Sequence, residues 1–240
     1  MDLTGKTALV TGGAKRLGKA IVLGLADAGC DLVLHFNTSS TEAEETAEQA
    51  RALGAMVDLV QADLGVDAAK AVTRPNGAEP IEILVNSAAM FPEDSITELD
   101  PDRFDTTIAV NLRAPVMLTA AFAQALPDDR EGAVINLTDW RTGRPYPNHF
   151  SYTVSKSGVD GFTIAAAEAL APRIRVNAVA LGAIIPPVDK SSAYLQDLAK
   201  DIPVQRVGGV EPVVEAVLFL LRNDFITGEI LRIDGGAHLR

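Results

Sequence analysis

Tyr152 and Lys156 are the two residues in this sequence whose types and spacing best suit proton chemistry. Residues four positions apart on an α-helix lie on one face, one turn above each other. Apolar residues at helical spacing follow, among them Val159 and Phe162, and predict such a helix. An ammonium group beside a phenol can lower the pKa of the phenol from about 10. The pair could therefore act as a proton donor or acceptor near neutral pH, although the same spacing also arises by chance on solvated helices.

The elements that must position this pair begin with a glycine-rich turn. Residues 7–10 form a short apolar run typical of a buried strand, residues 11–18 (Thr-Gly-Gly-Ala-Lys-Arg-Leu-Gly) follow, and a helical pattern continues until Gly29. Strand, turn and helix in this order place backbone N–H groups and a helix N-terminus where a pyrophosphate can bind. A plain strand-to-helix turn is the alternative interpretation, but this context favours a dinucleotide site.

The residues after the second strand, 31–36, indicate which dinucleotide is bound. An NAD-specific site usually has an acid here to hold the ribose 2′-hydroxyl, but the first acid after this strand is Glu42. Residues 37–40 (Asn-Thr-Ser-Ser) offer an amide and hydroxyl groups instead, and Lys15 and Arg16 add positive charge. Cations and hydroxyl groups suit a 2′-phosphate, so the pattern favours NADP(H) over NAD(H). Solvated loop charges are the alternative for the two cations.

Strands and helices alternate along the whole chain, with no repeat and no flexible linker. This pattern predicts an α/β fold, a single doubly wound, Rossmann-like domain (1–240) with a mostly parallel seven-stranded sheet flanked by helices. Strands are expected at residues 7–10, 31–36, 56–61, 81–85, 133–137, 173–180 and 229–233, and helices at 42–53, 100–122, 188–200 and 211–221, besides the helix with Tyr152.

Polar and small residues gather where the expected strands end. Asn86, Asp139 and Gly182 all fall at carboxyl ends of strands, where ligands bind in such sheets. The Tyr152–Lys156 pair should face the same end. Asp63 follows the third strand and suits two roles equally well, contact with an adenine amino group or capping of the next helix.

Asn111 marks an irregularity in the long helix that begins near residue 100. Asn is a poor helix former, and Pro115 follows four residues later. A polar side chain beside a helix-disrupting proline predicts a local break in the backbone hydrogen bonding. This favours a functional role for Asn111 over a solvated one.

Composition and charge narrow the class of protein. A chain of 240 residues with 48% hydrophobic residues can bury one large core. Its formal net charge of −11 argues against nucleic-acid binding. The single cysteine, Cys30, lies in an apolar context and is expected to be a buried small hydrophobe rather than a reactive thiol. The N-terminus has no signal-peptide pattern and no membrane span is predicted, so a cytoplasmic protein is expected.

Together these features resemble the short-chain dehydrogenase/reductase family over residues 6–236. The matching features are the turn at residues 11–18, Asp63, Asn86, Asn111, Tyr152 with Lys156, the Gly182 loop and Asp234-Gly235-Gly236. The resemblance implies hydride transfer with a nicotinamide cofactor. It also implies that Tyr152 is the acid/base, that Lys156 holds the nicotinamide ribose and lowers the pKa of the tyrosine, and that Asn111 orders a proton-relay water.

Two departures from most of the family resemble its pteridine reductase branch. Most members have Gly where this chain has Arg16, and Ser where it has Asp139, thirteen residues before the tyrosine. In that branch, the arginine contacts cofactor phosphate and substrate, and a phenylalanine, here Phe91, stacks a pterin against the nicotinamide. The aspartate works with the tyrosine and water to protonate a ring nitrogen, which suits C=N reduction. The chain differs from this branch at Ala89, Leu181 and Thr38.

The resemblance therefore implies a full set of site residues, with no metal. The catalytic residues would be Asp139, Tyr152, Lys156 and Asn111, and the substrate, a small molecule, would contact Arg16, Phe91, Asp139, Trp140 and Tyr152. NADP(H) would contact Gly12, Lys15, Arg16, Leu17, Phe36, Asn37, Thr38, Ser39, Asp63, Leu64, Asn86, Ser87, Ala88, Tyr152, Lys156, Gly182 and Ile184. Tetramers of the family suggest a homo-oligomer.

Two other functions stay open at this point. The first is a carbonyl reductase of ketones or sugars, against which Asp139 in place of serine counts. The second is an NADP(H)-binding sensor without turnover. A sensor would need the glycine turn but has no use for the Asn111, Tyr152 and Lys156 set.

Overall fold

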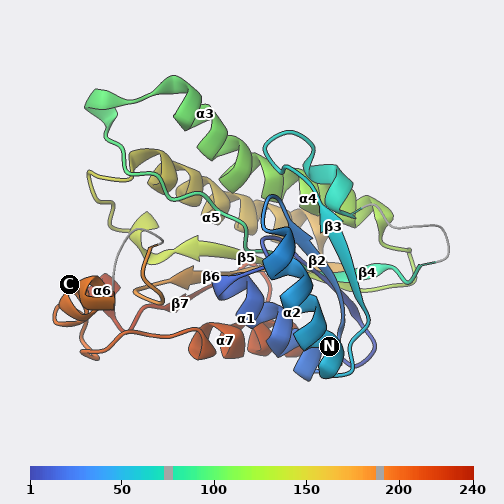
Figure 1. The fold of residues 1–240 in the computed structure, drawn as a ribbon. Helices are drawn as coiled ribbons and strands as arrows, with labels where there is room; N and C mark the ends of the chain where they lie inside the picture. Colours follow the sequence, from blue (N-terminus) through green and yellow to red (C-terminus); the bar gives the residue numbers. More distant parts are fainter. Residues whose placement is uncertain (73–77, 188–191) are drawn as a thin grey trace.

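The computed structural model describes residues 1–72, 78–187 and 192–240 (Figure 1). Its seven strands form one parallel sheet in the order β3-β2-β1-β4-β5-β6-β7. They are β1 (Thr7–Val10), β2 (Asp31–Phe36), β3 (Val57–Gln61), β4 (Ile81–Asn86), β5 (Gly132–Asp139), β6 (Ile174–Leu181) and β7 (Ile230–Ile233). The predicted fold class is confirmed. The strand order reverses between β1 and β4, and ligands of open α/β sheets bind at such a reversal.

Helices cover both faces of the sheet (Figure 1). One layer holds α1 (Arg16–Asp27), α2 (Ser40–Ala52) and α7 (Glu211–Arg222), and the other holds α4 (Ala114–Ala125), α5 (Phe150–Leu170) and the short η1 (Ala68–Val72). A hydrophobic cluster lies on each side of the strands. Strands buried on both faces read as continuous apolar runs, which is why they could be located in the sequence.

The helix expected at residues 188–200 is shorter in the structure. Residues 188–191 lie outside the described residues, and α6 spans Ser192–Ala199. The other expected boundaries agree to within two residues, except for the long helix.

The long helix is interrupted where the sequence predicts a break. α3 (Pro101–Ile108) and α4 are joined by a π-helical turn, η3 (Ala109–Arg113), and Asn111 in it is fully buried. Pro115 has no N–H, so it cannot donate the α-helical hydrogen bond to the carbonyl of Asn111. The predicted irregularity is confirmed.

The helical stretch Pro101–Ala125 is also long and apolar enough to cross a membrane, judged by length and composition. Its residues Leu118 and Phe122 are fully buried in the hydrophobic cluster between sheet and helices. The stretch therefore has the character of a core helix. Cys30 is buried too, and burial raises the pKa of its thiol to about 12, which confirms the expected inert side chain.

Candidate active site

Asp139 and Tyr152 lie in direct contact. Asp139 is the last residue of β5, Tyr152 lies in the first turn of α5, and the phenol oxygen of Tyr152 is 3.0 Å from Oδ2 of Asp139. The backbone N–H of Arg141 donates to the other carboxylate oxygen at 2.9 Å. The β5-to-α5 connection therefore holds the carboxyl group against the phenol.

Burial dominates the proton affinity of both groups. It raises the pKa of Asp139 above the ordinary aspartate value, against the opposing effects of the Arg141 N–H, the Arg141 charge and Tyr152. Burial also raises the pKa of Tyr152 well above 10, and the charge of Asp139 adds to that rise. The prediction of a lowered pKa for the phenol is wrong, because desolvation and the adjacent carboxylate disfavour the phenolate. Tyr152 is therefore a neutral proton donor.

Lys156 lies one turn further along α5, beside Tyr152 as predicted. Its ammonium is 5.8 Å from the centre of the Tyr152 ring and donates a 2.7 Å hydrogen bond to the carbonyl of Leu137. Burial lowers the pKa of Lys156 to about 8, although the charges of Asp139 and Asp160 oppose this. The lysine thus carries a charge that is unusually easy to lose.

Asn111 fixes the segment after β4. Its side chain accepts a hydrogen bond from the N–H of Met90 at 2.7 Å and donates to the carbonyl of Met90 at 2.8 Å. It also donates to Oγ of Ser155 at 3.1 Å. The amide therefore joins the π-helical turn to α5 and to the residue that precedes Phe91. Asn111, Tyr152 and Phe91 are brought together as expected.

The two aromatic residues of the implied substrate site, Phe91 and Trp140, have different neighbours. The ring of Phe91 meets the ring of Tyr152 edge-on, with centroids 4.6 Å apart, and Phe91 is 40% exposed. Trp140 follows Asp139 directly and stands edge-on to Tyr146 at 6.2 Å. Of these two residues, Phe91 is the one in ring contact with Tyr152.

The glycine turn leaves little room for side chains. Gly12 has a φ of +64°, and a Cβ at this position would lie 3.1 Å from Cα of Ala88. A Cβ on Gly18 would lie 2.1 Å from the carbonyl oxygen of Gly12. The turn therefore packs directly against the start of α1 and the segment after β4. Close backbone approach of this kind is what a pyrophosphate site needs.

His35 was missed by the sequence reasoning, although it holds the turn in place. The N–H of Gly12 donates to Nδ1 of His35 at 3.2 Å, and the N–H of Gly13 donates to its carbonyl at 2.9 Å. Nε2 of His35 lies 3.0 Å from the carbonyl of Ala62. Since Nδ1 accepts, Nε2 carries the proton. The histidine is buried, and burial lowers its pKa. The signal that could have identified His35 is a histidine within an apolar strand, β2, whose neighbouring strand leads into the turn.

The residues expected at a 2′-phosphate lie around the starts of α1 and α2. Lys15 is 3.9 Å from Glu42, with both side chains about half exposed, and precedes α1 without a side-chain cap among the described residues. Arg16 has a φ of +58°, unusual for a residue with a side chain, and its guanidinium donates to the carbonyl of Pro186. The contact of Arg16 with the loop after β6 could not be read from the sequence.

The remaining cofactor candidates fall into two groups. Leu17, Phe36, Leu64 and Ile184 are buried, so these side chains belong to the core. The others lie at the carboxyl ends of strands or in the turns that follow: Asn37, Thr38, Ser39, Asp63, Asn86, Ser87, Ala88 and Gly182. Oδ1 of Asp63 accepts the N–H of Gly65 at 2.9 Å, which makes it a local turn cap. That bond lies in the turn before η1 and does not cap this helix, so both the helix-capping role and the adenine contact stay predictions.

The segment after β4 is held against the glycine turn. The N–H groups of Ser87 and Ala88 both donate to Oγ1 of Thr11, at 2.9 and 3.0 Å. Nδ2 of Asn86 donates to Asn136 at 2.8 Å, while its buried Oδ1 accepts no hydrogen bond from the part of the chain that the structure describes. Directly after β6, a Cβ on Gly182 would lie 2.4 Å from Cα of Asp234. Glycine is required there because the two loops touch.

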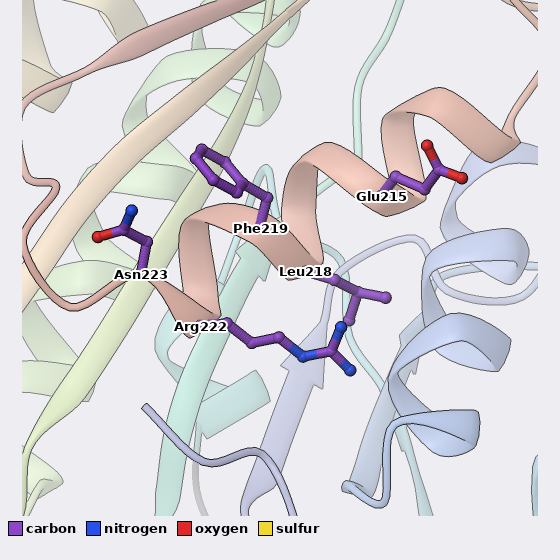
Figure 2. Close-up of a pocket in the computed structure, with 5 residues that line it drawn as sticks. All are labelled: Glu215, Leu218, Phe219, Arg222 and Asn223. Atoms are coloured by element: carbon purple, nitrogen blue, oxygen red, sulfur yellow. The ribbon is translucent and has the colours of Figure 1, made fainter.

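Two surface hollows lie elsewhere. One runs along α7, between Glu215, Leu218, Phe219, Arg222 and Asn223 (Figure 2). It lies in the helical layer opposite α5, and its charged lining residues are Glu215 and Arg222. The other borders Ala183, Ile184, Arg206, Arg232 and Asp234 at the ends of β6 and β7. It adjoins the Gly182 loop and does not reach Tyr152.

Comparison with known proteins places the chain among reductases. A family model described as "Enoyl-(Acyl carrier protein) reductase" matches residues 12–238. The 3-oxoacyl-[acyl-carrier-protein] reductase FabG of Staphylococcus epidermidis is 30% identical over 246 residues, covering 98% of this chain and 99% of the relative. The matched family model and this relative are both reductases.

Solved structures give the same result. FolM alternative dihydrofolate reductase 1 from Brucella canis, solved with NADP, superposes with a TM-score of 0.95 at 38% identity, covering 100% of this chain and 96% of the other. The angucycline C-6 ketoreductase LanV, solved with bound NADP, has a TM-score of 0.91 at 30% identity, with coverage of 100% and 98%. Both likenesses extend over the entire fold.

Proposed function

The chain belongs to the short-chain dehydrogenase/reductase family, and from that premise we propose that it is an NADPH-dependent oxidoreductase that reduces a C=N bond of a pterin- or folate-like heterocycle. The observation that carries this proposal is the hydrogen bond of 3.0 Å between Tyr152 and Asp139. A serine at position 139 would only donate a hydrogen bond to a carbonyl, whereas a carboxyl group can also relay a proton.

The residues at the turn after β1 fit NADP(H). Gly12 and Gly18 allow the backbone to come close, and the N-terminus of α1 offers N–H groups for a pyrophosphate. Lys15 and Arg16 supply positive charge, and residues 37–40 contain no acid that would repel a 2′-phosphate. The cofactor supplies the hydride. Lys156 is the residue that would hold its nicotinamide ribose.

Proton delivery falls to Tyr152 and Asp139. The neutral phenol donates its proton to the ring nitrogen as the adjacent carbon receives the hydride, so the C=N bond becomes a C–N single bond carrying one new C–H and one new N–H. The raised pKa of Asp139 lets its carboxyl group hold a proton more readily than an exposed aspartate would. That proton replaces the one lost by Tyr152. Asn111 would order the water that restores both groups.

Phe91 supports a flat substrate. Its ring is partly exposed beside the phenol, and an aromatic face stacks well on a heterocycle. The likeness to the FolM dihydrofolate reductase favours the same class. The likeness to FabG and LanV favours the second candidate, a ketoreductase. Arg16 and Trp140 complete the proposed substrate site.

One assay separates these functions. NADPH oxidation is followed at 340 nm with a dihydropteridine, dihydrofolate and a panel of ketones, using the wild-type protein and Asp139→Ser. We expect the wild type to reduce the pterin, and the serine variant to lose that activity while any gain appears on ketones. A wild type that reduces only ketones identifies a ketoreductase. Bound NADPH without turnover of any substrate identifies a sensor.

We also propose that the protein acts as a homotetramer in the cytoplasm. The outer faces of α4 and α5 expose Met117, Val154 and Ile164, which a two-fold contact between copies would cover. Light scattering after size-exclusion chromatography measures the state directly. A monomer would contradict this part of the proposal.

A further inference from the structure

We infer that His149 determines substrate specificity by positioning Phe91, holding its ring ready to stack on a flat heterocyclic substrate. This inference rests on the proposed function. It assigns a role to a residue for which the sequence pattern suggested none.

The imidazole of His149 lies flat on Phe91. The ring centroids are 4.0 Å apart and the planes are inclined by 20°, a stacked arrangement. Tyr152 meets the same Phe91 ring edge-on, at 86°. One face of Phe91 is thus covered by the imidazole, while Phe91 stays 40% exposed beside Tyr152. The exposed part of the ring is where we place the substrate ring.

Hydrogen bonding fixes the imidazole in this place. Nδ1 of His149 lies 2.7 Å from the carbonyl oxygen of Pro92. A carbonyl can only accept, so Nδ1 carries the proton. The anchoring carbonyl belongs to the residue next to Phe91, so the imidazole and the phenyl ring are held by the same short loop. The two rings therefore keep their relative orientation.

The backbone of His149 supports the arrangement. Its φ is +65°, a left-handed conformation in which His, Asn and Asp are enriched among residues with side chains. Its carbonyl accepts the N–H of Thr153 at 2.9 Å, so the residue caps the start of α5. This conformation directs the chain from the loop before α5 into the helix that carries Tyr152.

Asp94 joins the same loop to α5. Its carboxylate accepts the N–H of Ser151 at 3.1 Å and also the hydroxyl of Ser151. Its carbonyl accepts the N–H of Phe150 at 3.3 Å. The segment from Phe91 to Asp94 and the first turn of α5 therefore form one hydrogen-bonded unit. A substrate ring stacked on Phe91 would therefore lie at a fixed position relative to the phenol of Tyr152.

The oriented Phe91 ring should help flat substrates and aliphatic substrates to different extents. A pterin ring gains from a Phe91 face that is already oriented, because no ring motion must be frozen on binding. An aliphatic ketone has no flat π-system and gains nothing. Loss of the imidazole should therefore raise the KM for pterins and leave the KM for aliphatic ketones unchanged.

The experiment uses the full-length protein with three single variants and one double variant. His149→Asn keeps a residue that tolerates positive φ and removes the ring, His149→Phe keeps a ring and removes the donor, and Phe91→Leu removes the stacking partner without touching residue 149. The double variant combines Phe91→Leu with His149→Asn. KM and kcat are measured with a dihydropteridine and an aliphatic ketone, and NADPH affinity is measured by fluorescence titration.

For His149→Asn we expect KM for the pterin to rise roughly three- to tenfold, the range of one aromatic stacking contact. kcat should change less, and NADPH affinity should stay the same. His149→Phe should recover only part of the pterin KM, because it keeps a ring but lacks the donor to Pro92. The double variant should have no higher KM than Phe91→Leu alone, because a residue that acts through Phe91 has no effect once the ring is gone.

Different results overturn different claims. A wild type that does not reduce the dihydropteridine overturns the proposed function and this inference with it. Pterin turnover by the wild type, with an unchanged KM in His149→Asn or additive effects in the double variant, overturns the inference alone. An equal KM rise for pterin and ketone also overturns it, because that result indicates general damage.

Discussion

The two ends of the candidate active site are held in different ways. At the glycine turn the donors are main-chain N–H groups: those of Gly12 and Gly13 donate to Nδ1 and to the carbonyl of His35, and Gly18 has no space for a Cβ. At the other end, side chains of Asp139 and Tyr152 bond to each other. Main-chain contacts depend on the fold, whereas side-chain contacts depend on residue identity. The glycine turn is therefore compatible with many nicotinamide reactions, whereas under the proposed function the identities of residues 139 and 152 select the substrate.

The largest expected effect breaks the side-chain end alone. Tyr152→Phe removes the phenolic proton and keeps the ring, so kcat should fall by at least roughly 10²-fold, the lower range of general acid catalysis. NADPH affinity should stay nearly constant, because the glycine turn is untouched. Steady-state kinetics and cofactor titration measure the two effects separately. A near-normal rate would remove Tyr152 from the mechanism.

Arg16→Gly tests the glycine turn and should have two opposite effects: weaker cofactor binding and higher stability of the fold. Loss of a charge-assisted phosphate contact, worth about 1.5–3 kcal/mol, should weaken NADPH binding roughly ten- to a hundredfold and NADH binding less. Glycine also adopts the φ of +58° freely, so unfolding free energy should rise by about 1 kcal/mol. Titration and urea unfolding check both signs. Equal losses for NADPH and NADH would contradict the 2′-phosphate role of this turn.

His35 should matter for the turn more than for the chemistry. His35→Leu leaves the N–H of Gly12 without an acceptor and should lower unfolding free energy by about 1–3 kcal/mol, with a parallel loss of NADPH affinity. His35→Asn is the matched control, because its amide oxygen lies where Nδ1 was. We expect Asn to retain more affinity than Leu; the reverse order would exclude the role of Nδ1.

The lowered pKa of His35 predicts how the stability of the fold depends on pH. Burial lowers the pKa of His35 below 6.5, so the unfolded chain binds a proton that the folded protein rejects. Stability should therefore fall as pH drops through 6.5, and the fall should end below the folded pKa. In His35→Leu this contribution should be absent. Thermal melting between pH 5 and 8 measures the difference.

The smallest expected effect is a change in the pKa of Lys156, which lies beside Tyr152 and is proposed to hold the cofactor ribose. Its pKa of about 8 should appear as an alkaline fall in kcat/KM, since the charged lysine is the form that would hold the ribose. The Asp139 charge raises this pKa, so Asp139→Asn should move the fall to lower pH. Because Asp139→Asn is expected to lower the turnover rate, its pH dependence is measured as NADPH affinity at each pH. A shift to higher pH would contradict the coupling.

Local patterns in the sequence determined the fold and most of the site. Continuous apolar runs located the strands, because a parallel sheet is buried on both faces. The glycine turn, Asn111 beside Pro115, and Tyr152 four residues before Lys156 are short-range signals, and the structure brings them together at the carboxyl ends of the strands. Spacing of this kind depends only on helix and strand geometry.

Tertiary structure alone decided the contacts between distant segments and the proton affinities. The bonds of His35 to Gly12 and Ala62, and the stack of His149 on Phe91, join residues that no spacing relates. The spacing of Tyr152 and Lys156 predicts a lowered pKa for the phenol, but burial and Asp139 raise that pKa. The reason is physical: desolvation and Coulomb interactions depend on how deeply a group is buried and on what surrounds it in space.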